Sequence, residues 1–156
     1  MTDDVRARVV WIGGPPDGGK TGVARELARR YGTIRYEYDR RDRQHHAILA
    51  QESAAYRAFL AASLDERWVT PSPVELAARA EAAFRDRFPL VLDDLLVLRA
   101  VPREVVVVEG FGLTPGLVAP QLRTLRQAAW AVPPPTLRQA SREQRRPVVP
   151  EPGGGA

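Results

Sequence analysis

The chain has 156 residues, of which 44% are hydrophobic, enough for one domain with a buried core. It contains no cysteine, which excludes a disulfide framework and fits a reducing compartment. Its N-terminus lacks the charged-then-apolar layout of a signal peptide, and no apolar run approaches the length of a membrane span. We therefore expect a soluble, cytoplasmic protein without a membrane partner.

The formal net charge is +4, and nearly all the basic residues are arginines. A basic balance indicates nucleic-acid binding only where the cations cluster. Here the arginines are spread along the whole chain, with acids between them from residue 1 to 104. This distribution favours arginines on solvated surfaces over a nucleic-acid interface. A nucleic-acid-associated NTPase is kept as an alternative.

A strand, a glycine-rich loop and a helix are predicted in succession near the N-terminus. An apolar run covers 9–12, and a helical pattern of apolar residues covers 23–31. Between them Gly14, four residues, Gly19 and Lys20-Thr21 match the pattern G-x-x-x-x-G-K-S/T. In this strand–loop–helix context the pattern indicates a phosphate-binding loop.

The residue types of this loop suit a polyphosphate. Glycines allow the backbone to approach closely, and successive N–H groups with the helix N-terminus form an anion nest. Lys20, the only lysine in the chain, would reach the β- and γ-phosphates, and Thr21 would place its hydroxyl on Mg²⁺. Pro15 and Pro16 have no N–H, so the donors should begin at Asp17. The expected nucleotide-binding residues are Gly14, Asp17, Gly18, Gly19, Lys20 and Thr21.

Asp17 is the awkward member, because a carboxylate repels phosphate. Translation GTPases carry aspartate at the matching place in their loops. That resemblance implies that the Asp17 side chain points away from the phosphates.

A second strand is predicted over 33–38, after Gly32 ends the first helix. It is followed by Asp39 and a run that includes Arg40 and Arg43. Because ligands of open α/β sheets lie beyond the carboxyl ends of the strands, these three residues are candidates for an acceptor site. An exposed charged turn is an equally good interpretation.

The middle of the chain reads as helices. One is expected over about 43–64, a second over 73–87 capped by Ser72 with Glu75 in a capping box, and a third starting at Pro89. His45 and His46 are adjacent and therefore diverge on a helix, so we expect solvated histidines rather than a metal site. The pair Asp93-Asp94 is expected on a solvated helix face.

Four consecutive valines at 105–108 predict a strand buried on both faces, as in the centre of a parallel sheet. Glu109 follows at its carboxyl end and would point toward Mg²⁺ near the phosphates. It could hold Mg²⁺ through water, polarise the attacking group, or cap the next loop.

The last part of the chain is expected to hold a short helix after Thr114, a strand over 127–132 and a helix over 136–146. Arg138, Arg142 and Arg145 fall on one face of that last helix. The remaining segment, 147–156, is rich in proline and glycine, and we expect it to be disordered. The predicted division is therefore a domain over 1–146 and a tail over 147–156.

In this layout residues 6–146 resemble the small P-loop kinases, such as adenylate, cytidylate, shikimate and gluconate kinases. The resemblance rests on Gly14–Thr21, on Asp39 after the second strand, and on Glu109-Gly110, where adenylate kinase carries an aspartate–glycine pair. It implies a three-layer α/β fold with a parallel sheet of order 2-3-1-4-5. It also implies ATP as phosphate donor, with Mg²⁺.

The resemblance further implies an arginine-bearing lid, here Arg138, Arg142 and Arg145, that closes on the transferring phosphate. A solvated basic helix end is the alternative. The chain departs from the family at the fifth strand, because Val148-Val149 between prolines is too short for one. The expected order is therefore 2-3-1-4, and base binding and turnover are left open.

The sequence thus predicts an ATP-binding protein, a kinase that transfers the γ-phosphate of Mg·ATP to a hydroxyl or phosphate of an unidentified small molecule. A nucleotide-binding module with little turnover is the second hypothesis, and the preference for ATP over GTP is a default. The metal ligands would be Thr21 and Glu109. The expected catalytic residues are Lys20, Asp39, Glu109, Arg138 and Arg142.

Overall fold

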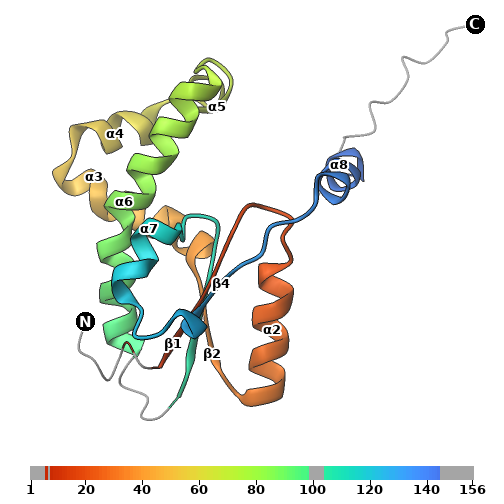
Figure 1. Ribbon diagram of the computed structural model, residues 1–156. Coiled ribbons are helices and arrows are strands. Elements are labelled where there is room, and N and C mark those ends of the chain that lie inside the picture. Colours follow the sequence, from red (N-terminus) through yellow and green to blue (C-terminus); the bar gives the residue numbers. More distant parts are fainter. Residues whose placement is uncertain (1–5, 7, 99–103, 145–156) are drawn as a thin grey trace, which may run out of the picture.

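The computed structural model describes residues 6, 8–98 and 104–144, and within them the chain forms one all-parallel sheet of four strands (Figure 1). The strand order is β2-β3-β1-β4. This confirms the predicted α/β class and the order 2-3-1-4. The strands are β1 (Val9–Gly13), β2 (Ile34–Glu37), β3 (Val106–Glu109) and β4 (Ala128–Trp130).

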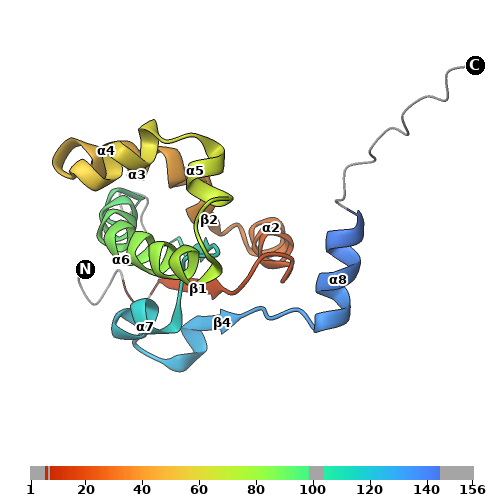
Figure 2. The same ribbon diagram turned by 90° about the horizontal axis from the view of Figure 1, so that it is seen from above.

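Helices lie on both faces of the sheet. In both views α2 stands to one side of the strands, and α6 and α7 stand to the other (Figures 1 and 2). The α-helices are α2 (Lys20–Tyr31), α3 (Asp42–Glu52), α4 (Ala54–Ala61), α5 (Leu64–Trp68), α6 (Pro73–Leu98), α7 (Pro115–Val118) and α8 (Pro135–Gln144). Short 3₁₀ helices are η1 (Tyr38–Arg41), η2 (Ala119–Gln121) and η3 (Leu125–Gln127).

The alternation of side chains along β1 and β3 divides the core into two parts. Trp11 and Val108 point to the side of α6, where Phe88 and Leu95 join them. Val107 points to the opposite side, where α2 packs. β3 is therefore buried on both faces at Val106, Val107 and Val108, as predicted, whereas Val105 precedes the strand and is 37% exposed.

Helix α2 begins and ends at glycines. Gly19 and Gly32 both have left-handed backbone conformations, and the N–H of Gly32 donates to the carbonyl of Ala28. The predicted stop at Gly32 is confirmed, because a left-handed residue after a helix is the common way to satisfy its last carbonyls.

The single helix expected over 43–64 is wrong. Two helices, α3 and α4, occupy this stretch and are separated at Ser53, and a third, α5, begins after Ser63. Both serines are extended, and their hydroxyls accept hydrogen bonds from the N–H groups of Tyr56 and Glu66. A serine that caps a new helix competes with continuation of the old one.

The break expected at Pro89 is also wrong, because α6 runs unbroken through it, although the capping box of Ser72 and Glu75 is confirmed at its start. Proline removes one helical hydrogen bond, which usually ends or kinks a helix. Here Pro89 is exposed, while Phe88, Val91 and Leu95 form one buried stripe across it. Burial of that stripe against the sheet outweighs the lost bond.

The C-terminal predictions hold in outline. The strand expected over 127–132 is β4, and the helix expected over 136–146 is α8. The tail 147–156 lies outside the described residues. Among the residues that are described, no helix is long and apolar enough to cross a membrane.

Two neighbouring leucines of α6 test the packing on the sheet. Leu95 is 1% exposed and Leu96 is 38% exposed. Leu95→Ala should lower the free energy of unfolding by about 2–5 kcal/mol, because it leaves a cavity in the core. Leu96→Ala is the matched control and should cost less than about 1 kcal/mol. Urea denaturation of both variants measures the difference, and equal losses would contradict the described burial.

Candidate phosphate-binding site

The loop between β1 and α2 bends at three residues with positive φ. These are Gly14 at +122°, Asp17 at +67° and Gly19 at +79°. The two glycines adopt such angles without strain, and aspartate is among the few other residues that tolerate them. The glycine-rich loop predicted from the sequence therefore lies at the carboxyl end of a central strand, directly before a helix N-terminus.

The segment after β4 packs closely against this loop. The N–H of Ala131 donates to the carbonyl of Gly13 at 3.0 Å. A Cβ atom at Gly14 or Gly18 would stand 2.4 or 2.3 Å from the carbonyl oxygen of Ala131. Gly18 therefore has a packing reason to be glycine, and a single sequence carries no signal for it.

Lys20 is the first residue of α2 and is only 6% exposed. Its Nζ donates to the carbonyl of Pro15 at 2.8 Å, so the side chain folds back across the loop. Among the described residues Lys20 forms no ion pair with a carboxylate. A buried ammonium with only a neutral partner favours the arrival of an anion, because burial of an unpaired charge is costly.

Thr21, the residue after Lys20, contacts Glu109 at the end of β3. The Thr21 hydroxyl donates to Oε1 of Glu109 at 3.0 Å. Glu109 is 4% exposed, ends β3 and lies on the sheet face that α2 covers. The Glu109 carboxylate therefore lies at the N-terminus of α2, and its predicted role with Mg²⁺ stays a prediction.

Asp39 lies beyond the carboxyl end of β2, in η1. Its Oδ1 accepts a hydrogen bond from the N–H of Phe111 at 3.3 Å, which links it to the segment that follows Glu109. The side chain is exposed, and no hydrogen bond or ion pair joins it to the loop 14–19 in the described chain. Arg40 forms an ion pair with Glu37, and Arg43 is exposed.

Tyr38 packs closely against the segment that follows Glu109. A Cβ at Gly110 would stand 2.4 Å from the Cβ of Tyr38, and one at Gly112 would stand 2.4 Å from its hydroxyl. Burial raises the pKa of the Tyr38 hydroxyl to about 12, so the ring is neutral. The glycine after Glu109 is therefore required by close packing.

Of the arginines proposed for a lid, the structure describes the side chain of Arg138 alone. Helix α8 stands clear of the sheet in both views (Figures 1 and 2). Arg138 is exposed, and its side chain makes no hydrogen bond or ion pair among the described residues. The side chain of Arg142 and all of Arg145 lie outside the described part. Their role stays a prediction.

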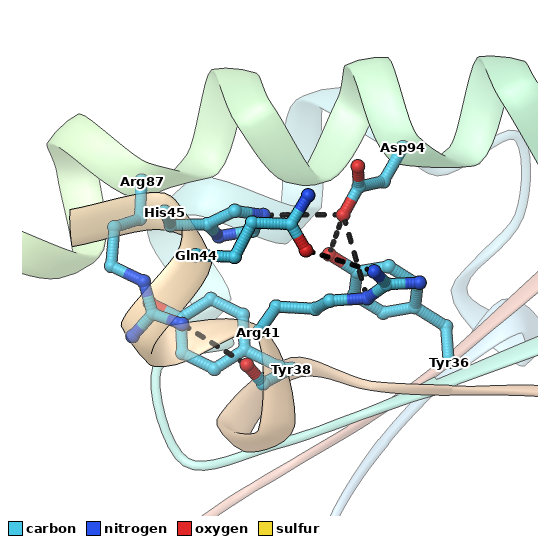
Figure 3. A network of polar contacts seen from close by, with 7 residues as sticks. All are labelled: Tyr36, Tyr38, Arg41, Gln44, His45, Arg87 and Asp94. Atoms are coloured by element: carbon cyan, nitrogen blue, oxygen red, sulfur yellow. Dashed lines mark hydrogen bonds and ion pairs between the residues drawn. The ribbon is translucent and has the colours of Figure 1, made fainter. Parts of the chain in front are cut away.

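A buried polar network between β2, α3 and α6 was missed by the sequence analysis (Figure 3). Oδ2 of Asp94 accepts from the Tyr36 hydroxyl at 2.7 Å and lies 3.1 Å from Nε2 of His45. His45 and His46 are both buried, so the expectation of solvated histidines is wrong. Asp94 is partly buried, so the solvated acidic pair is correct only for Asp93.

Arg87 forms the other half of this network (Figure 3). Its Nη2 donates to the carbonyl of Tyr38 at 3.0 Å, and its guanidinium lies 4.0 Å from the centre of the Tyr38 ring. Arg87 also pairs with Asp42 at 2.6 Å. A signal existed in the sequence, because Arg87 and Asp94 are seven residues apart and share the buried side of α6 with Phe88 and Val91.

With this geometry in hand, comparison with protein-family models and with curated proteins finds no match to the chain. The site itself is therefore the only indication of function among these observations.

Two glycine-to-alanine substitutions test the packing of the loop against the carbonyl of Ala131. Gly18→Ala should lower the free energy of unfolding by about 1–3 kcal/mol, because the new Cβ meets the Ala131 carbonyl. Gly22 lies in α2, and a Cβ added there would meet no atom beyond its own helix within 4 Å, so Gly22→Ala should stabilise by up to about 1 kcal/mol. Opposite signs in urea denaturation are expected. Two stabilising substitutions would show that the Ala131 segment does not press on the loop.

The buried histidine gives a pH prediction. Burial lowers the pKa of His45, so the unfolded chain binds a proton more readily than the folded chain. The free energy of unfolding should therefore fall as pH drops below about 6.5, the ordinary pKa of histidine. His45→Gln should flatten this dependence between pH 7.5 and pH 5.5, a range of about one unit around that value. Parallel pH profiles of variant and wild type would rule the assignment out.

Proposed function

We propose that the chain is an ATP-dependent phosphotransferase of the P-loop type that acts on a small molecule. The observation that carries the proposal is Lys20, a buried ammonium at a helix N-terminus whose partner is the neutral carbonyl of Pro15. A triphosphate would supply the missing negative charge. The glycine-rich turn in front of this lysine supports the same ligand.

The loop would bind the phosphates through backbone N–H groups from Asp17 onward and through the N-terminus of α2. Helix α2 has twelve residues, and the unpaired N–H groups of its first turn give that end a partial positive charge. On binding, Lys20 would exchange the Pro15 carbonyl for a phosphate oxygen. It would then stabilise the charge that develops on the transferring phosphoryl group.

Thr21 and Glu109 fit Mg²⁺. They offer two adjacent oxygens, the ligand type that Mg²⁺ prefers, and this ion usually takes one or two protein oxygens and completes its shell with phosphates and water. The described residues contain no cluster of three or more metal-binding side chains, so a fully protein-built metal cage is not present among them. Bound there, Mg²⁺ would neutralise phosphate charge.

Asp39 would act on the acceptor. It is an exposed carboxylate at the carboxyl end of β2, oriented by its bond from the N–H of Phe111. It would take the proton of the acceptor hydroxyl as the new oxygen–phosphorus bond forms and the bond to the departing ADP breaks. Arg138 would join only if α8 moves toward the loop.

The proposal predicts nucleotide affinity that depends on Lys20. Calorimetry should detect binding of Mg·ATP to the wild type, and Lys20→Ala should weaken it at least about tenfold, since a charge-assisted contact is lost. Arg25→Ala is the matched control, because Arg25 is an exposed cation of the same helix, and it should bind like the wild type. Equal affinity of the wild type and Lys20→Ala for Mg·ATP, or no binding of any nucleoside triphosphate by the wild type, would overturn the proposal.

A second candidate is a nucleotide-binding module with little turnover. It is favoured by the exposed position of Arg138 and by the four strands of the described sheet, one fewer than the small P-loop kinases have. The two candidates separate when Mg·ATP is incubated with a panel of nucleosides, sugars and hydroxy acids. Transfer above the Lys20→Ala background supports the kinase, and binding without transfer supports the module.

A further inference from the structure

The helices between β2 and β3 form a cavity that is open to the surface and has a volume of about 490 Å³. Its walls come from α3, α4, α5 and the first half of α6, which lie together at one end of the molecule (Figure 1). The lining includes no residue of the loop 14–21, and neither Asp39 nor Glu109. The volume falls within the range of about 300–1,000 Å³ that is usual for small-molecule sites.

Most of the cavity wall is apolar and consists of aromatic rings and alanine methyl groups. Tyr56 and Phe59 present aromatic rings, and their centroids lie 5.5 and 5.4 Å from the ring of His46. Methyl groups and ring faces suit a flat, largely apolar ligand. Five alanines complete the walls: Ala55, Ala58, Ala62, Ala82 and Ala83.

The charged residues of the cavity are not equivalent. Glu66 already accepts a hydrogen bond from the N–H of Ser63, and Asp86 accepts one from the hydroxyl of Tyr56. Among the described residues Arg67 donates one hydrogen bond, from its Nε to the carbonyl of Ala62, and its guanidinium lies 5.3 Å from the centre of the Phe59 ring, while the side chain of Arg79 makes no hydrogen bond. Because a guanidinium carries five N–H donors, Arg67 and Arg79 keep most of their donors available for an anionic group.

His46, which lines the cavity, is connected through Asp42 to Arg87 of the polar network. His46 is 8% exposed, and its Nδ1 lies 3.1 Å from Oδ2 of Asp42. The other oxygen of Asp42 accepts from Arg87, which in turn donates to the carbonyl of Tyr38 (Figure 3). A lining residue that hydrogen bonds already hold needs little ordering when a ligand binds, which favours affinity.

We propose that this cavity binds a small molecule with a flat apolar ring and one anionic group, such as an aromatic carboxylate. The ring lies against Tyr56, Phe59 and the alanine walls, and the anion meets Arg67 and Arg79. The assignment does not depend on nucleotide binding.

The probes are biphenyl-4-carboxylate, its neutral counterpart biphenyl-4-methanol, and hexanoate, titrated into the full chain by calorimetry. The carboxylate should bind with a dissociation constant of about 1 mM or tighter. Biphenyl-4-methanol should bind about tenfold more weakly because it lacks the charge, and hexanoate should bind more weakly because it lacks the rings.

Three variants locate the binding. Arg79→Met should weaken the carboxylate about tenfold, while Arg85→Met, which removes an exposed cation of the same helix outside the cavity, should not. Ala82→Trp should block the cavity, with circular dichroism showing that the fold is kept. Lys20→Ala should leave probe binding unchanged, so failure of the nucleotide proposal does not affect this result.

The proposal is overturned if biphenyl-4-carboxylate does not bind to the wild type. It is also overturned if Arg79→Met and Ala82→Trp bind this probe as tightly as the wild type does. Sedimentation that shows a dimer disrupted by Ala82→Trp would also overturn it, because a second copy of the chain would then cover the cavity.

Discussion

The alignment of β1 with β3 is the constraint on which the candidate site depends. Ile12 pairs with Glu109 across these parallel strands, so the last residue of one strand stands level with the end of the other. The loop that leaves β1 must therefore turn into α2 beside the Glu109 carboxylate, where the Thr21 hydroxyl meets it. A slip of one residue in this register would point Glu109 to the opposite face of the sheet, away from α2.

The parts of this arrangement that sequence analysis predicted are those fixed by local chemistry. Valines in succession favour a strand buried on both faces, and Gly32 can adopt the left-handed conformation that ends α2. The pattern from Gly14 to Thr21 predicted the position of the loop between β1 and α2. Each of these features depends on residues close together in the chain, so a single sequence carries enough information.

The parts that were wrong or missed depend on contacts between distant residues. Proline normally ends a helix, yet α6 continues past Pro89 because its apolar stripe packs on the sheet. Two histidines at the start of a helix look solvated until Asp94, about fifty residues later, supplies a partner for His45. Likewise, the packing of Gly18 against Ala131 joins segments that are far apart in the sequence.

The most direct test of the central claim observes the loop itself. Backbone amide resonances of a ¹⁵N-labelled sample can be followed by NMR as Mg·ATP is added. If the loop between β1 and α2 holds the phosphates, the largest chemical-shift changes should fall on the N–H groups of residues 17–21. The next largest changes should fall on Glu109 and its neighbours. Unchanged resonances for 17–21 at a saturating nucleotide concentration, or shifts confined to other parts of the chain, would contradict the account.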